Sequence, residues 1–192
     1  MVEVKKVVYL REIRWHGRGG QGAWTASELL ARAAIQEGKY IQSFPEFGPE
    51  RMGAPVKAFT RISDAPINLH CAVYSPDVVA VLDPTLLKTV PVTEGLKKDG
   101  VLVINTRETP AQLSKQLNFP SQQLWTISAT DIAVRILGRP ITNTAMLGAV
   151  ARTAEIVDLK SIQEAIKERF PLKIAERNMK IVEKAYKEVK SG

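Results

Sequence analysis

The chain has 192 residues, of which 45% are hydrophobic and 24% are charged. This length suits one average domain, and the composition is that of a globular protein rather than a disordered or fibrous one. A single cysteine, Cys71, excludes an internal disulfide, a four-cysteine zinc site and a [4Fe–4S] cluster held by this chain alone. The formal net charge of +7 permits an anionic partner but does not select among nucleic acid, a phosphorylated cofactor and an acidic protein.

Apolar runs along the chain are short. None approaches the roughly 18 residues that a membrane-spanning helix needs. The apolar run within the first eleven residues is also too short for the core of a signal peptide. We therefore expect a cytoplasmic protein without a membrane partner.

Predicted strands and helices alternate over the first two-thirds of the chain. A β-branched run predicts a strand that ends at 12–15, and apolar residues at helical spacing predict a helix over 23–37. Further strands are predicted at 40–44, 54–61, 77–83, 101–104 and 124–127, and a helix at 110–117. The continuous apolar run at 77–83 is typical of a strand covered on both faces. This order predicts an α/β fold with a mostly parallel sheet.

The last third of the chain is predicted to be helical, with helices at 131–137, 144–156, 159–169 and 174–189. The last of these carries one apolar stripe, which we expect to be core packing: Ala175, Met179, Val182, Tyr186 and Val189. We expect a single domain over 1–192, with an α/β part to about residue 137 and a helical part from about 140 to 192.

A glycine-rich loop follows the first predicted strand. Gly17, Gly19 and Gly22 satisfy G-x-G-x-x-G between a strand and a helix, so backbone N–H groups converge where the helix dipole favours an anion. Arg18 adds a cation suited to a phosphate. Three interpretations stay open: contact with a phosphate or nucleotide, a tight structural turn, or a surface that receives another subunit.

The dinucleotide interpretation lacks one residue. A nicotinamide fold needs an acidic side chain about 20 residues after the loop, at the end of the second strand, and Gln42 and Ser43 occupy that region. A stand-alone NAD(P)-dependent dehydrogenase is therefore a weaker hypothesis. Nucleic-acid binding is a third hypothesis, which only the net charge suggests, and we do not expect it.

A second segment, 43–55, is rich in proline and glycine and carries apolar and charged side chains. A stiff loop of this kind suits an interface or the wall of an active site, and a self-packed Ω-loop is the structural alternative. The candidate residues for an interface or active-site wall are Phe44, Glu46, Glu50, Arg51 and Met52.

Five other residues have mainly structural interpretations. His16 is expected to be a hydrogen-bonded histidine at a strand end, and Cys71 a small buried residue. Asn143 and Thr144 are expected to cap the helix that follows them. Asp83 ends a core strand, and it either faces a ligand crevice or caps the next helix.

Four stretches resemble the gamma subunit of 2-oxoacid:ferredoxin oxidoreductases, in the order that this family has. They are EIRWHGRGGQGAWTASELLA (12–31), FPEFGPERMGAPVKAFTRI (44–62), DVVAVLDPTLL (77–87) and NTAMLGA (143–149). The GxERxGAP form at 48–55 is most similar to the pyruvate branch. Met52 departs from the family at a position where many relatives carry an arginine.

The resemblance implies a Rossmann-like three-layer domain within an enzyme of alpha, beta, gamma and delta chains. In that family, thiamine diphosphate with Mg acts on the 2-oxoacid, [4Fe–4S] clusters carry electrons to ferredoxin, and coenzyme A receives the acyl group. It implies pyruvate as the substrate, with a branched-chain or shared gamma subunit as the alternative. The gamma chain is expected to hold no redox cofactor itself and to be inactive alone.

The resemblance also suggests roles for the two loops. The phosphates of coenzyme A are expected at the glycine loop, formed by Gly17, Arg18, Gly19, Gly20, Gln21 and Gly22. The loop at 46–55 is expected to wall the active site or to dock on the alpha chain.

Overall fold

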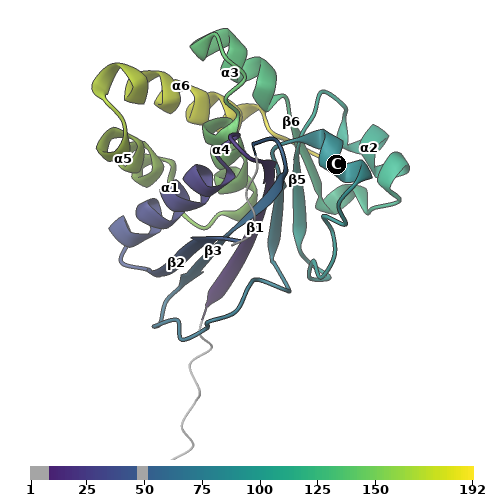
Figure 1. Ribbon diagram of the computed structural model, residues 1–192, viewed down its shortest axis with the longest axis horizontal. Coiled ribbons are helices and arrows are strands. Elements are labelled where there is room, and N and C mark those ends of the chain that lie inside the picture. Colours follow the sequence, from purple (N-terminus) through teal and green to yellow (C-terminus); the bar gives the residue numbers. More distant parts are fainter. Residues whose placement is uncertain (1–8, 47–51) are drawn as a thin grey trace, which may run out of the picture.

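The computed structural model describes residues 9–46 and 52–192 (Figure 1). Its strands are β1 (Leu10–Arg18), β2 (Tyr40–Pro45), β3 (Pro55–Ser63), β4 (Val78–Val81), β5 (Val101–Asn105), β6 (Leu124–Ile127) and β7 (Lys190–Ser191). Its α-helices are α1 (Ala23–Gln36), α2 (Pro110–Leu117), α3 (Ala129–Leu137), α4 (Asn143–Ala154), α5 (Leu159–Arg169) and α6 (Leu172–Glu188). Two short 3₁₀ helices complete the elements, η1 (Pro84–Lys88) and η2 (Ser121–Gln123).

One sheet contains the described strands in the order β2-β3-β1-β4-β5-β6-β7. The pairs β1–β4, β4–β5 and β5–β6 are parallel. The pairs β2–β3, β1–β3 and β6–β7 are antiparallel, so β3 and β7 run against the other strands. The prediction of an α/β fold with a mostly parallel sheet is confirmed.

Helices cover the two faces of the sheet unequally (Figure 1). Helices α1, α3, α4, α5 and α6 form a thick layer on one face, and their apolar residues share one core with Trp15, Ala80 and Val103 of the sheet. On the other face, η1 and α2 pack on Val79 and Ile104 in a smaller core. The alternation of neighbouring β4 residues between the two cores explains why this strand is apolar throughout. The Rossmann-like three-layer arrangement is confirmed.

The predicted elements agree closely with the observed ones, and α2 and α5 have the predicted bounds. The stripe on α6 packs as expected, with Ala175 and Val182 buried. One local prediction is wrong: α4 begins one residue early, so Thr142 is its N-cap residue and Asn143 lies in its first turn. Asn143 still accepts a hydrogen bond from the Thr144 amide at 2.8 Å, and the Thr144 hydroxyl donates to Asn178 Oδ1 at 2.9 Å.

Helices α4 and α6 approach each other at Gly148. A Cβ atom at this position would lie 2.4 Å from the carbonyl oxygen of Val182, closer than real contacts allow. The absence of a side chain at Gly148 therefore sets the distance between these two helices.

Substitution Gly148→Ala tests this contact. Helix propensity alone would stabilise the protein by about 1 kcal/mol, but we expect a net loss of about 1–2 kcal/mol because the backbones must separate. Chemical denaturation measures the difference. Arg177→Ala, at an exposed position of α6, should change the free energy of unfolding by less than about 0.5 kcal/mol. A more stable Gly148→Ala variant would contradict the assignment.

Candidate functional site

The candidate site lies at the point of the sheet where the strand order reverses. After β1 the chain builds β2 and β3 on one side, and after its return it builds β4, β5 and β6 on the other side. The carboxyl ends of β1 and β4 are adjacent, since His16 pairs with Val81. In open α/β sheets, ligands bind outside the strand ends at such a topological switch point.

The glycine loop leaves the end of β1 and is joined to the second proline–glycine segment. The Gly19 amide donates to the Ala54 carbonyl at 2.8 Å, and the Gly53 amide donates to the Gly19 carbonyl at 3.1 Å. Gly20 and Gly22 have φ angles of 93° and 78°, which side chains rarely tolerate. Sequence reasoning treated the two segments separately, but the fold makes them one surface.

Gly22 is favoured mainly by its conformation, and it also lies close to a side chain of another helix. A Cβ atom here would lie 2.5 Å from Nδ2 of Asn143, the first residue of α4. The loop is therefore pressed against the helix that carries the predicted NTAMLGA motif. Two motifs more than 100 residues apart in sequence meet at this contact.

Four side chains form a hydrogen-bonded cluster across the switch point. Arg18 Nε lies 3.2 Å from Asp83 Oδ2, and Arg18 Nη2 donates to the Thr85 hydroxyl at 2.8 Å. Gln21 Nε2 donates to Asp83 Oδ2 at 2.7 Å. Asp83 also accepts from the Thr85 amide at 3.0 Å and so caps η1. Of the two roles that its sequence position suggested, the structure supports the cap of the next helix.

The surroundings of Asp83 favour its ionised form. Burial by itself raises the pKa of this carboxyl, but hydrogen bonds from Thr85 and Gln21 and the charge of Arg18 outweigh burial and leave the pKa below its usual value. The guanidinium of Arg18 is also bound, through Nη1, to the Gly53 carbonyl at 3.1 Å. Arg18 is therefore a positioned cation at the edge of the glycine loop.

A hollow of about 710 Å³ opens beside this loop. We call it the phosphate hollow, and it is lined by Arg18, Gly19, Gly20, Gly22, Ala23, Trp24, Thr25, Pro45, Val56 and Lys57. Helix α1 begins in its wall, with no side-chain cap and no acidic residue in the first turn. The first amides of a helix have no partner within the helix, so this wall suits an anion.

The second segment contributes side chains with different environments. Phe44 packs on Phe59 with ring centroids 5.2 Å apart, and Glu46 pairs with Lys57 at 3.2 Å. Met52 is 95% exposed. Glu50 and Arg51 lie outside the described residues.

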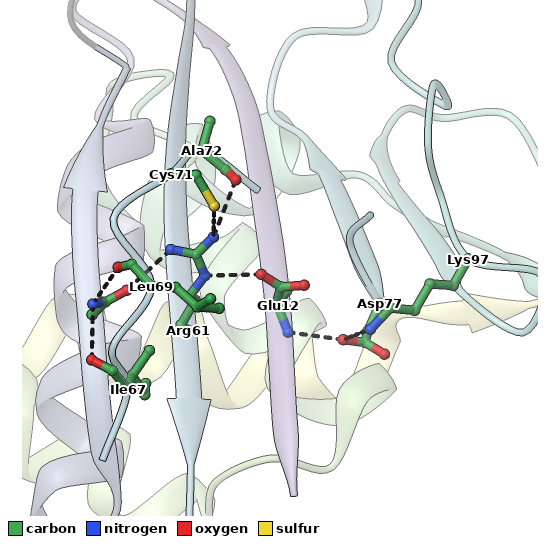
Figure 2. Close-up of polar contacts among 9 residues, drawn as sticks. Glu12, Arg61, Ile67, Leu69, Cys71, Ala72, Asp77 and Lys97 are labelled. Carbon is green, nitrogen blue, oxygen red and sulfur yellow. Dashed lines mark hydrogen bonds and ion pairs between the residues drawn. The ribbon is translucent and has the colours of Figure 1, made fainter. Parts of the chain in front are cut away.

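Arg61 is the charged residue that sequence reasoning missed. Only 1% exposed, it pairs with Glu12 at 2.8 Å and donates to Gln42 Oε1 at 3.0 Å and the Ala72 carbonyl at 3.1 Å (Figure 2). Gln42 in turn donates to the carbonyls of Ile67 and Leu69. These bonds hold the segment 64–77 across β2 and β3. The alternation of apolar and polar residues over 54–61 predicted which face of the strand carries Arg61. It did not show that a loop would cover that face of the sheet.

The prediction that Cys71 is buried is wrong. Its side chain is exposed, and its sulfur lies 3.7 Å from Arg61 Nη2 (Figure 2). In the segment that carries Cys71, Arg61 and Gln42 hold the backbone carbonyls of Ala72 and Leu69, and the Cys71 side chain itself stays exposed.

His16 is a satisfied strand-end histidine, as predicted. Its Nε2 accepts a hydrogen bond from Arg14 Nε at 3.0 Å, and Arg14 also donates to the carbonyls of Val92 and Glu94. Burial, reinforced by the charges of Arg14 and Lys57, lowers the pKa of His16 to about 3. The imidazole is therefore neutral at physiological pH.

Among residues 9–46 and 52–192, no group of three or more His, Cys, Asp or Glu side chains is arranged to hold a metal ion. In the same part of the chain, no helix is long and apolar enough to cross a membrane.

Comparison with known proteins identifies the family. The family model for pyruvate ferredoxin/flavodoxin oxidoreductase matches residues 12–188. The chain belongs to the pyruvate ferredoxin/flavodoxin oxidoreductase family. This membership confirms the resemblance that the glycine loop and the other three motifs indicated.

The similar proteins are named as subunits of such oxidoreductases. The chain is 55% identical to the pyruvate/ketoisovalerate oxidoreductases common subunit gamma of Thermococcus kodakarensis, over 91% of this chain and 95% of the relative. It is 52% identical to the pyruvate synthase subunit PorC of Methanocaldococcus jannaschii, over 93% and 96%. The crystal structure of pyruvate oxidoreductase subunit PORC from Thermotoga maritima superposes with a TM-score of 0.84 at 44% identity, over 94% and 97%.

Stability should depend on pH through His16 in this member of the family. Below pH 6.5 the unfolded chain takes up a proton that the folded chain, with a His16 pKa of about 3, does not, so stability falls as pH drops through this range. Between pH 7.5 and 4.5 we expect the protein to lose about 2–3 kcal/mol more than a His16→Gln variant.

Urea denaturation at the two pH values measures this difference. The matched control is His70→Gln, which replaces an exposed histidine and should behave like the unchanged protein. An equal loss in the unchanged protein and in His16→Gln would contradict a buried neutral imidazole.

Proposed function

We propose that this chain is the gamma subunit of a multisubunit 2-oxoacid:ferredoxin oxidoreductase that acts on pyruvate. Pyruvate and coenzyme A are converted to acetyl-CoA and CO₂, and the two electrons released reduce ferredoxin. The observation that carries this proposal is identity above 50% over more than nine-tenths of both chains, to relatives named as subunits of such enzymes.

Other chains are proposed to hold the redox chemistry. Thiamine diphosphate with Mg acts between the alpha and beta chains, and [4Fe–4S] clusters pass electrons to ferredoxin. One cysteine does not suffice for the four thiolates of a [4Fe–4S] cluster, so this chain does not hold one alone. Its own share is to bind and position, and we place the assembled enzyme in the cytoplasm.

The glycine loop is proposed to receive the phosphates of coenzyme A. Three features suited to an anion meet in the phosphate hollow. They are the uncapped amides at the start of α1, the glycines with positive φ, and the cations Arg18 and Lys57. Arg18 is held by Asp83, Thr85 and Gly53, which fixes its direction before a ligand arrives. Such pre-organisation lowers the entropic cost of binding.

The second segment is proposed to dock on the alpha chain beside this hollow. Met52 and Trp24 are large apolar side chains with 95% and 55% exposure, and both come from segments that border the hollow. Apolar side chains of this kind are typical of the centre of a protein interface. Glu46, Glu50 and Arg51 belong to the same proposed surface.

The alternative substrate is a branched-chain 2-oxoacid, through a gamma chain shared by two enzymes. The Thermococcus relative is named for both pyruvate and ketoisovalerate. A stand-alone NAD(P) dehydrogenase is less favoured, because Gln42 stands in the region where the acid would lie and binds loop carbonyls.

Purification from the native cells tests the subunit assignment. We expect the chain to co-purify with a thiamine-binding chain and a cysteine-rich ferredoxin-like chain, and the isolated chain to be inactive. Native mass and peptide sequencing measure the composition. A free 21.2 kDa monomer or a homo-oligomer without iron would contradict the proposal.

Kinetics of the assembled enzyme test the phosphate site. Loss of one charge-assisted hydrogen bond costs about 1.5–3 kcal/mol, so Arg18→Ala should raise KM for coenzyme A by roughly 10- to 100-fold. KM for pyruvate should stay unchanged. Arg32→Ala, which removes an exposed arginine of α1 paired with Glu28, is the control. An unchanged KM for coenzyme A in Arg18→Ala would end the phosphate assignment.

A further inference from the structure

Three helices of the thick layer begin close to one another. Gly22, just before α1, lies against the Asn143 side chain in the first turn of α4. The Thr144 hydroxyl in the same turn donates to Asn178 Oδ1, in the second turn of α6, at 2.9 Å. The start of α4 is therefore in contact both with the start of α1 and with the first part of α6.

Two further contacts fix the direction of these helices. Gly148 and Val182, each four residues further along its helix, are again close together, so α4 and α6 run in the same direction. Arg169, three residues before α6, has its Nε 3.9 Å from Glu28 Oε2 in the second turn of α1. Helices α1, α4 and α6 thus begin at the same end of the layer.

Large apolar side chains are exposed around these three helix starts. Ile141, just before α4, is 44% exposed, and Leu172 and Ile174, in the first turn of α6, are 72% and 47% exposed. Trp24 at the start of α1 is also exposed and lines the phosphate hollow. Several exposed apolar side chains that lie together mark an interaction site more strongly than scattered ones. We call this end the helix-start face, and it carries Arg139, Ile141, Leu172, Lys173, Ile174 and Arg177.

The helix-start face is also electropositive. Arg139, Lys173 and Arg177 are exposed, and no ion pair found within 9–46 and 52–192 includes any of them. Helices α1, α4 and α6 each begin without a side-chain cap and without an acidic residue in the first turn. The positive ends of three helix dipoles therefore add to these cations, and Glu176 in the second turn of α6 offsets one charge.

We propose that the helix-start face docks on another subunit of the oxidoreductase, through a partner surface with an apolar centre and an acidic rim. The inference rests on the proposed function. Charge complementarity selects this occupant, because the apolar side chains of the face stand among cations that have no acidic partner on this chain's described surface. A symmetric contact between two copies of this chain would place like charges and like helix ends against each other, so a second copy is disfavoured.

Carbodiimide cross-linking of the complete enzyme tests the inference. The reagent joins a lysine amine to a carboxylate that it touches, and peptide mass spectrometry identifies both residues. We expect Lys173 to be joined to an Asp or Glu of another subunit. Lys160, an exposed lysine at the opposite end of α5 from α6, is the matched control and should form no such link.

Variants of the face give a second readout. Arg139→Glu combined with Lys173→Glu should weaken the binding of this chain to the other subunits by about tenfold or more, and the weakening should shrink as salt is added. Ile174→Ser should weaken binding by roughly five- to tenfold through lost apolar contact. Co-purification with a tagged chain over a dilution series measures the binding.

Matched controls carry the same chemical changes elsewhere. Lys160→Glu reverses a charge away from the face, and Ile35→Ser alters an exposed isoleucine at the other end of α1. Both should bind like the unchanged chain. All the substituted side chains are exposed, so the urea midpoint of each isolated variant should stay the same, which separates lost docking from lost folding.

The outcomes separate this inference from the proposed function. If the chain co-purifies with a thiamine-binding chain and a cysteine-rich chain, but Lys173 forms no link to them and the variants bind normally, the inference is wrong and the subunit assignment stands. Links from Lys173 to a second copy of this chain would also overturn the inference. If no such chains co-purify, the proposed function itself fails, and the inference fails with it.

Discussion

The close approach of the glycine loop to its neighbours is the constraint on which the site depends. Gly22 has a positive φ and lies close to the Asn143 side chain, and Gly19 is bonded to the backbone at 53–54. These contacts bring α1, α4 and the second segment to one edge of the sheet. The Arg18–Asp83 pair then joins β1 to β4 across the switch point. The anion-suited wall exists because all these elements meet there.

Buried arginines organise the face of the sheet opposite the thick helical layer. Arg61 is neutralised by Glu12 and holds a loop through its carbonyls, whereas Arg14 binds a neutral histidine and two carbonyls. Leaving either guanidinium without partners would be costly, because a buried charge requires hydrogen bonds. The bonds that satisfy Arg61 also hold the loop 64–77 against β2 and β3, whereas those of Arg14 hold the segment 92–94.

This architecture suits a chain whose contribution to catalysis is positional. Its polar groups at the strand ends are bound to one another before any ligand arrives, and its large exposed apolar side chains lie beside them. The proposed function asks this chain to bind a cosubstrate and to dock on a partner, and a rigid surface of this kind supports that proposal.

Sequence alone determined most of the elements, the class of fold and the family, but it did not predict β7 or the two 3₁₀ helices. The spacing of apolar residues and the position of helix-breaking residues predicted the first and last residues of α2 and α5 correctly. The glycine loop was recognised because glycine readily adopts the backbone angles of its turns. Tertiary structure decided which segments meet. The antiparallel placement of β3, the burial of Arg61 and the exposure of Cys71 depend on contacts between residues far apart in the chain. Local patterns report which face a residue is on, but the element that covers that face is chosen by the fold as a whole.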